Sequence, residues 1–216
     1  MKYQAVLFDL DGTLLDTIED LTDSMNAVLE RLGFPLHNIE EYKLIVGEGI
    51  DVLIKRSLPD SADLETVKKA IDMMKEEYGK RYKLKTKPYP GIPELLDELV
   101  ARKLSMSIFS NKPDEFTSKL VSKLFPAWHF DVVLGEGRGI PKKPNPEGAL
   151  KIANQLNIKP EKFLYLGDTG IDMQTAKNAG MMGVGVLWGF RSQKELIENG
   201  AKHIILHPLE LFKILE

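Results

Sequence analysis

The sequence predicts an α/β protein with a Rossmann-like parallel sheet flanked by helices and a helical cap domain inserted after the first strand. Two observations predict this architecture. Short apolar segments alternate with segments of helical periodicity along most of the chain, which is typical of a parallel sheet covered by helices. One long region after the first apolar segment has helical periodicity throughout. We therefore expect a core domain formed by residues 1–16 and 86–216 and a cap domain formed by residues 17–85.

The expected core strands are short apolar runs separated by amphipathic segments. The strands are expected at residues 5–8, 105–109, 132–134, 163–166 and 183–187, with a weaker one at residues 203–206. Helical periodicity between the later strands predicts helices over residues 92–102, 114–124, 147–156 and 173–179.

The region assigned to the cap has apolar residues spaced three and four apart. Leu21, Met25 and Val28 belong to one such series, and Gly33 is expected to end that helix. A second series covers residues 71–78. A segment containing proline and glycine then ends the helical region and restricts the return to the core.

The composition excludes several classes of protein. A formal net charge of −3 at pH 7 gives no broad basic field for nucleic acid. The absence of cysteine excludes disulfides, thiolate metal ligands and a cysteine nucleophile. The apolar run at the start is too short for a signal peptide, and no segment approaches the ~20 apolar residues of a membrane span. We expect a cytoplasmic monomer or homodimer that binds a small molecule.

Asp9 and Asp11 follow the first strand two residues apart. Because side chains alternate along an extended chain, this spacing sends both carboxylates to the same side. Adjacent carboxylates repel each other unless a cation lies beside them. Gly12 permits a sharp turn that leaves both at the sheet edge. The pair is either a nucleophile beside an acid–base group or a loop of solvated or capping aspartates.

Ser110 and Asn111 follow the second core strand, and Pro113 suits the first turn of a helix. Free amides and a helix N-terminus can hold phosphate oxygens, although plain N-capping explains the same pattern. Lys143 precedes Pro144 in a segment with two prolines, which hold the loop extended. Such a loop can aim one ammonium group at a fixed point; the alternative is a solvated basic turn.

Asp168 ends a strand that should be buried, and Asp172 lies in the first turn of the next helix. The helix dipole alone favours a carboxylate at the position of Asp172. A purely structural role explains Asp168 less well, because Asp168 follows a buried run.

These polar groups follow strands or lie in a loop that leads into a helix. Ligands of open α/β sheets bind at the carboxyl ends of the strands, so we expect the groups to converge there. Several carboxylates without cysteine or histidine match a hard cation such as Mg²⁺. A carboxylate nucleophile, a lysine and Mg²⁺ suit phosphoryl transfer, where positioning and charge neutralisation provide most of the catalysis.

Taken in order, these segments resemble the four motifs of the haloacid dehalogenase superfamily of phosphohydrolases, and the resemblance covers essentially the whole chain. The helical insert resembles the superfamily's cap of the first type. Within the superfamily the chain is most similar to phosphoglycolate phosphatases, over residues 6–17, 88–91, 167–180 and 186–192. The fourth motif has Thr169 where serine is commoner, and both residues carry a hydroxyl group.

The resemblance implies that Asp9 attacks phosphorus and becomes an aspartyl-phosphate. Asp11 would protonate the leaving oxygen and then activate water. Lys143 would neutralise charge on Asp9 and on the phosphoryl oxygens. Ser110 and the Asn111 amide would bind those oxygens.

The resemblance also implies a Mg²⁺ site formed by Asp9, the carbonyl oxygen of Asp11, and Asp168. Asp172 would support the metal or the catalytic lysine from behind, and Thr13 is expected among the supporting residues. The presence of Asp11 favours phosphate ester hydrolysis or phosphomutation over dehalogenation, since a departing halide needs no proton.

The expected cap contacts are less specific. Residues 46–50 contain two glycines and form a tight loop between helices. Gly49 in this loop and Arg56 beyond it are predicted to face the substrate, with Arg56 meeting a carboxylate. An ordinary turn with solvated charges explains the same residues equally well.

The expected reaction is Mg²⁺-dependent hydrolysis of a small phosphorylated metabolite, with 2-phosphoglycolate as the first choice of substrate. The same chemistry on pyrophosphate, a sugar phosphate or a nucleotide monophosphate is an alternative. A phosphomutase acting on β-glucose 1-phosphate is another, and a binding protein that kept the fold is a third.

Overall fold

A central parallel sheet organises the molecule, whose computed structural model describes residues 2–137 and 139–215. Within these residues the sheet has six strands in the order β5-β4-β1-β6-β7-β8, and every neighbouring pair is parallel. The strands are β1 (Ala5–Phe8), β4 (Ser105–Pro113), β5 (Val132–Glu136), β6 (Phe163–Gly167), β7 (Met182–Val186) and β8 (His203–Ile205). This confirms the predicted fold class.

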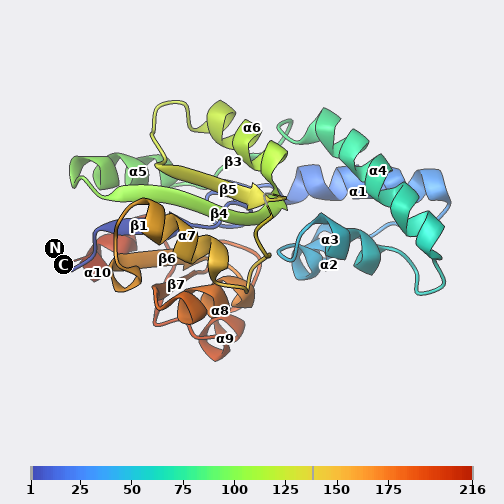
Figure 1. Cartoon of the computed structure of the whole chain (residues 1–216). Coiled ribbons are helices and arrows are strands. Elements are labelled where there is room, and N and C mark those ends of the chain that lie inside the picture. The colour runs from blue at the N-terminus through green and yellow to red at the C-terminus, as the bar shows by residue number, and fades with distance from the viewer. Residues whose placement is uncertain (1, 138, 216) are drawn as a thin grey trace.

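Both faces of the sheet are buried, as the apolar sequences of the inner strands require. In β1, Val6 and Phe8 belong to the hydrophobic cluster on one face, and Ala5 and Leu7 belong to the cluster on the other. Helices α5 (Ile92–Ala101) and α6 (Asp114–Leu124) cover the first face. Helices α7 (Glu147–Gln155) and α8 (Gly170–Ala179) cover the second, and the three layers are visible in Figure 1.

The remaining short elements complete the C-terminal part of the core. They are the helices α9 (Gln193–Glu198) and α10 (Phe212–Leu215) and the 3₁₀ turns η1 (Pro160–Lys162) and η2 (Pro208–Leu211).

Two elements differ from the expected boundaries in ways that affect the polar segments. Strand β4 continues to Pro113, so Pro113 precedes the first turn of α6 instead of lying in it. Helix α8 begins at Gly170, earlier than expected, because Thr169 and Asp172 form a reciprocal capping box at its N-terminus.

The helical region after β1 has its own hydrophobic cluster. It contains α1 (Ile18–Leu32), α2 (Ile39–Ile45), α3 (Ile50–Ser57) and α4 (Leu64–Arg81). Gly33 ends α1 in the left-handed conformation, with φ of 75°, as its position in the sequence predicted. The antiparallel pair β2 (Leu15–Asp16) and β3 (Lys87–Pro88) carries the chain out of the core and back. The domain boundaries at residues 17 and 85 stay a prediction.

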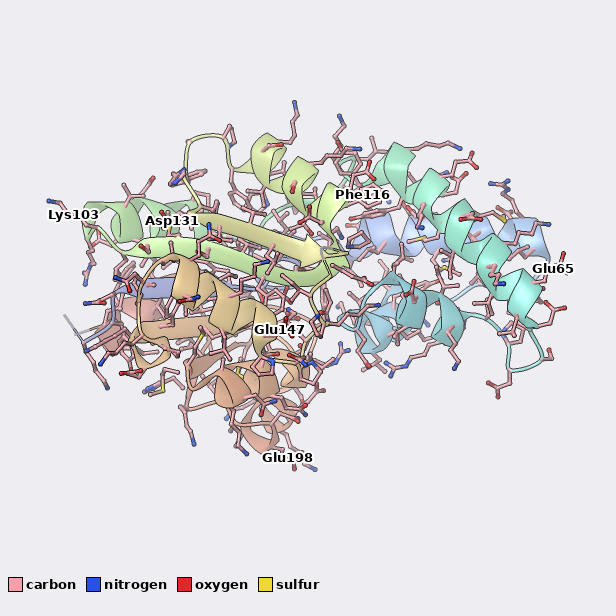
Figure 2. All side chains as sticks on the ribbon, in the orientation of Figure 1. Glu65, Lys103, Phe116, Asp131, Glu147 and Glu198 are labelled. Atoms are coloured by element: carbon pink, nitrogen blue, oxygen red, sulfur yellow. The ribbon has the colours of Figure 1, made fainter. Side chains whose placement is uncertain are left out.

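The helical region packs directly on the core at α6 and at the loop after β7. Phe116 of α6, labelled in Figure 2, contacts the ring of Tyr78 in α4 edge to face, with ring centroids 4.9 Å apart. Phe190, in the loop after β7, belongs to the same hydrophobic cluster as the four helices. Across the described residues, no helix has the length and apolar character needed to cross a membrane.

Candidate active site

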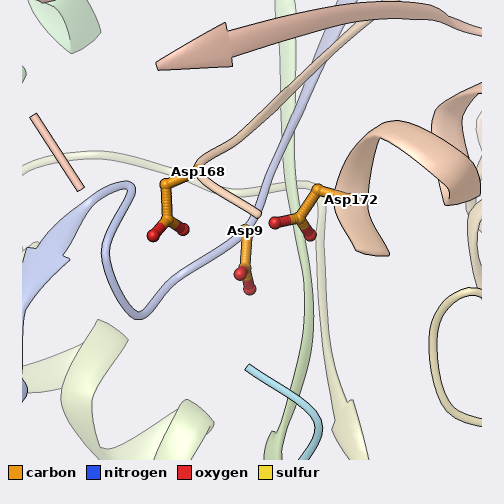
Figure 3. A group of neighbouring side chains, drawn as sticks. All are labelled: Asp9, Asp168 and Asp172. Atoms are coloured by element: carbon orange, nitrogen blue, oxygen red, sulfur yellow. The ribbon is translucent and has the colours of Figure 1, made fainter. Parts of the chain in front are cut away.

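Three buried carboxylates converge at the carboxyl ends of β1 and β6. The residues are Asp9, Asp168 and Asp172 (Figure 3). Each contributes one carboxylate oxygen to a group of three oxygens that lie within 4.8 Å of one another. Asp9 and Asp168 follow two adjacent strands, and Asp172 is in the first turn of α8. The sheet order therefore brings together residues that are more than 150 positions apart in the chain.

Lys143 supplies the positive charge beside these carboxylates. Its Nζ lies 2.9 Å from Asp9 Oδ1 and 2.7 Å from Asp172 Oδ1, and its side chain is fully buried. The backbone on both sides of the Lys143 side chain is held by Asn111: Lys143 N donates to Asn111 Oδ1 at 2.8 Å, and Asn111 Nδ2 donates to Lys143 O at 3.2 Å. The Lys143–Pro144 peptide bond is cis.

Asp172 is fixed on both of its oxygens. Oδ1 accepts from Lys143, while Oδ2 accepts from the hydroxyl of Thr169 at 2.6 Å and from its backbone N–H at 3.1 Å. Because Oδ1 is paired with the Lys143 ammonium and Oδ2 is fixed by Thr169, Asp172 is suited to orienting that lysine.

Asp168 is held by one residue from each neighbouring loop. Its Oδ1 accepts from the Thr13 hydroxyl at 3.2 Å, and its Oδ2 accepts from Phe190 N at 2.9 Å. The backbone at Gly12 has φ of +80° and passes close to the Asp168 side chain. A Cβ atom at Gly12 would lie 2.3 Å from Asp168 Oδ2. A glycine is therefore required for this close approach.

The cluster has more negative charge than its lysine compensates. Burial raises the pKa of Asp9 to about 7, and the nearby Asp172 charge adds to this rise while Lys143 opposes it. Burial, followed by the charges of Asp172 and Asp9, holds the pKa of Asp168 well above its usual range. Burial lowers the pKa of Lys143, but Asp172 and Asp9 outweigh this effect, and the net shift is strongly upward.

The arrangement fits a hard divalent cation. Three ionised carboxylates and one ammonium group leave two negative charges in a buried space, and the available donors are oxygens. Asp9 and Asp168 are the candidates to hold such an ion: Asp168 accepts only from the neutral Thr13 hydroxyl and Phe190 N–H, whereas Asp172 is committed to the Lys143 ammonium and to Thr169.

The raised pKa values predict how the stability of the metal-free protein depends on pH. A carboxyl whose pKa is higher in the folded state stabilises that state below the unfolded pKa, and this stabilisation is lost as the pH rises through the folded value. For Asp9, whose pKa is raised to about 7, the free energy of unfolding should fall by roughly 2 kcal/mol between pH 5 and pH 7, and Asp168 should change it in the same direction. Urea unfolding in EDTA at a series of pH values measures this free energy. The fall should be smaller for Asp9→Asn, and a flat profile for the wild type would contradict the expectation.

Asp11 does not join the carboxylate cluster but pairs with a lysine that the sequence analysis did not select. Lys112 Nζ lies 3.0 Å from Asp11 Oδ1 and 2.9 Å from Oδ2, and its side chain is buried. Burial lowers the pKa of Lys112, but Asp11 and Tyr78 outweigh this effect and the net direction is upward, so its ammonium group is charged.

Ser110 and Asn111 lie at an irregular part of β4. The register of β4 with β5 shifts between Phe109 and Pro113. Ser110 lines the cavity described below, and its hydroxyl oxygen accepts from Lys112 N at 3.4 Å. The side-chain amide of Asn111 is engaged by Gly47 O at 3.1 Å and by Lys143 O, so its role in the structure is to join the core loop to the cap. The backbone N–H of Asn111, and not its side-chain amide, is therefore the candidate to bind a phosphate oxygen.

A small cavity of about 40 Å³ separates these groups from the cap. The core contributes Asp9, Asp11 and residues 110–113 to its wall, and the cap contributes Leu21, Val46, Gly47, Gly49, Ile50, Leu53 and Tyr78. Gly49 therefore lines the cavity, and its contact with the substrate stays a prediction. Its φ of +94° lets the cap loop approach the core closely.

Arg56 lies outside this cavity, in contrast to the expectation. It pairs with Glu48 at 2.6 Å and lines a separate surface depression. The reason is its place on α3: Leu53 is at the cavity wall, and Arg56 is nearly one turn further along the helix, where Glu48 supplies the counter-charge.

Arg191 is a second residue that the sequence analysis missed. Its guanidinium donates to the carbonyl oxygens of Lys43, Leu44 (3.0 Å) and Val46 (2.9 Å), at the C-terminus of α2. The preceding residue, Phe190, donates its N–H to Asp168. One core loop thus holds both a carboxylate of the cluster and a helix end of the cap. Periodicity finds neither residue: Lys112 directly follows Ser110 and Asn111, and Arg191 lies within residues 186–192, a segment that carries the family resemblance.

Comparisons with known proteins cover the whole chain. The family model of haloacid dehalogenase-like hydrolases matches residues 6–186. The phosphoglycolate phosphatase of Nitrosospira multiformis is 33% identical over 224 residues, which cover 100% of this chain and 97% of that protein. The phosphoglycolate phosphatase of Aquifex aeolicus is 30% identical over 213 residues, which cover 99% of this chain and 97% of that protein. A crystal structure from Lactobacillus delbrueckii subsp. bulgaricus, assigned as a phosphoglycolate phosphatase, has a TM-score of 0.93 and 33% sequence identity to this chain. The match covers 100% of this chain and 99% of that one.

Proposed function

Because this chain belongs to the haloacid dehalogenase-like hydrolases and is a phosphatase, we propose that it hydrolyses a small phosphate monoester, with 2-phosphoglycolate as its substrate. The observation that carries this proposal is the placement of Asp9 and Asp11 at one small cavity, with Lys143 on the first and Lys112 on the second. The names of relatives that align over nearly their full length support the choice of substrate.

Two half-reactions complete the hydrolysis. A carboxylate oxygen of Asp9 forms a bond to phosphorus while the bond from phosphorus to the ester oxygen breaks, and Asp11 gives its proton to that oxygen. The alcohol then leaves. In the second half, Asp11 takes a proton from water as the water oxygen bonds to phosphorus. The bond between phosphorus and Asp9 breaks, and inorganic phosphate leaves with Asp9 restored.

The surrounding groups stabilise negative charge on the transferred phosphoryl group. The ammonium of Lys143 is already 2.9 Å from Asp9 and stays charged, so it can contact both the nucleophile and a phosphoryl oxygen. The hydroxyl of Ser110 and the backbone N–H of Asn111 provide further donors. Their fixed positions reduce the reorganisation that the reaction requires.

We further propose that the resident metal is Mg²⁺, held by Asp9, Asp168 and the carbonyl oxygen of Asp11. When bound, it would neutralise charge on the carboxylates and on the phosphoryl oxygens. Thr13 and Phe190 orient Asp168 for this role through their hydrogen bonds to its two oxygens.

The cavity of about 40 Å³ is too small for any of the candidate esters, so the cap has to move before any of them can bind. Pyrophosphate, sugar phosphates, nucleotide monophosphates and β-glucose 1-phosphate isomerisation are the alternatives to be compared directly, because caps of this kind open during turnover.

Phosphate release from a panel of esters tests the proposal. The panel contains 2-phosphoglycolate, pyrophosphate, glucose 6-phosphate, β-glucose 1-phosphate and AMP, each with Mg²⁺ or with EDTA. We expect kcat/KM to be highest for 2-phosphoglycolate, by at least about 10-fold, and to be lost in EDTA. A preference for another ester would keep the mechanism and discard the substrate. Conversion of β-glucose 1-phosphate to glucose 6-phosphate faster than phosphate release would favour a mutase. The cytoplasmic location and the monomeric or dimeric state stay predictions.

A further inference from the structure

Lys112 is a buried cation at the cap side of the cavity, distinct from the lysine that contacts the nucleophile. Lys143 contacts Asp9 and Asp172, whereas Lys112 contacts Asp11 through both carboxylate oxygens. The Lys112 ammonium also lies 4.6 Å from the centroid of the Tyr78 ring, in cap helix α4. The two lysines therefore face different parts of any bound substrate.

The position of Lys112 corresponds to the part of the substrate beyond the ester oxygen. In the proposed reaction, phosphorus is at Asp9 and the ester oxygen is at Asp11. Lys112 is one hydrogen bond from Asp11, at 2.9 Å. An anionic group on the carbon next to the ester oxygen would thus lie within about a hydrogen-bond length of the ammonium group.

The rest of the cap wall offers no competing positive charge among the described residues. The side chains that line the cavity from the cap are Leu21, Val46, Ile50, Leu53 and Tyr78. Arg56, the other cation considered for this role, is held by Glu48 at a separate surface depression. A carboxylate in the leaving group would therefore find its counter-ion at Lys112, in surroundings where an unpaired charge is costly.

We propose that Lys112, supported by Tyr78, binds a carboxylate of the leaving group and so selects short phosphorylated hydroxy acids over neutral phosphate esters. This inference rests on the proposed phosphatase function and gives it a substrate class. It also implies that Lys112 divides its hydrogen bonds between Asp11 and the substrate carboxylate, as an ammonium group with three donors can.

The test compares two esters that share the phosphoryl group and the adjacent CH₂ group and differ in whether that CH₂ carries a carboxylate. Ethyl phosphate replaces the carboxylate of 2-phosphoglycolate by a methyl group. In the wild type we expect kcat/KM to favour 2-phosphoglycolate. In Lys112→Met that preference should shrink by about 10–100-fold, mainly through KM, because a charge-assisted hydrogen bond is lost. Lys112→Arg should restore part of the preference for 2-phosphoglycolate over ethyl phosphate. Lys119→Met, which removes an exposed lysine paired with Glu115, should leave the preference unchanged.

The ratio between the two esters separates recognition from positioning. If Lys112 only oriented Asp11, Lys112→Met would slow both esters by the same factor, and this outcome would overturn the proposal. Loss of the preference in Arg56→Met but not in Lys112→Met would also overturn it, and would assign the carboxylate to the other cation.

A binding measurement keeps this inference separate from the proposed function. Calorimetric titration of Asp9→Asn, with and without Lys112→Met, compares the Kd values of the two esters without turnover. We expect tighter binding of 2-phosphoglycolate that depends on Lys112. If the wild type hydrolyses neither ester, the proposed function fails, yet this titration still decides the role of Lys112. Equal Kd values for the two esters, or no binding of either, would overturn the proposal that Lys112 binds the carboxylate of the leaving group.

Discussion

Replacing Asp9 by asparagine should abolish phosphate release from every ester, lowering kcat by about 10⁴-fold or more. Asparagine keeps the shape of the side chain but lacks the carboxylate oxygen that attacks phosphorus. The loss should be the same for 2-phosphoglycolate and for an activated aryl phosphate, because a better leaving group does not replace a nucleophile. Initial rates of phosphate release at saturating Mg²⁺ measure this effect.

The fold should survive this substitution. Asp9 is buried and its pKa is raised to about 7, so a neutral amide removes an unfavourable charge at pH 8. Thermal unfolding close to that of the wild type would show that lost activity does not reflect lost structure. Asp23→Asn, at an exposed aspartate paired with Lys85, is the matched control and should keep full activity. Multiple turnovers by Asp9→Asn at a rate near the wild type would show that another group is the nucleophile.

Replacing Lys143 by methionine should affect both activity and stability. It removes the ammonium beside Asp9 and leaves three carboxylates close together in a buried site. We expect a fall in kcat of about 10²–10³-fold. In metal-free protein at pH 8, the free energy of unfolding should fall by about 3–5 kcal/mol. At pH 5 the destabilisation should be smaller, because Asp9, with a pKa of about 7, then carries a proton.

Two further variants give this prediction its controls. Lys119→Met removes an exposed ion pair and should change the free energy of unfolding by less than about 1 kcal/mol. Adding Asp172→Asn to Lys143→Met removes one of the unpaired charges, so stability should partly return while activity does not. Equal stability of wild type and Lys143→Met at pH 8 would show that the buried lysine does not compensate the carboxylates. Urea unfolding in EDTA measures all three variants.

Local sequence was sufficient for the features that depend on periodicity along one segment. The alternation of strands and helices predicted the parallel sheet, and Gly33 predicted the end of α1. The order of polar segments after the strands placed Asp9 and Asp168 at one edge, because parallel strands all present their carboxyl ends on the same side. The boundaries were less predictable, since the capping box that starts α8 depends on hydrogen bonds between side chain and backbone.

Only the tertiary structure decided which partner each polar group has. Lys112 pairs with Asp11 across 101 positions of sequence, and the amide of Asn111 joins Gly47 to Lys143 across the gap between cap and core. Arg56 pairs with Glu48 and lies away from the cavity. The physical reason is that the contacts of Lys112 and Asn111 depend on which strands are neighbours and on how the cap packs against the core, whereas that of Arg56 depends on how α3 and the loop before it fold together. Local periodicity determines the face on which a side chain lies, but not the distant segment that the face meets.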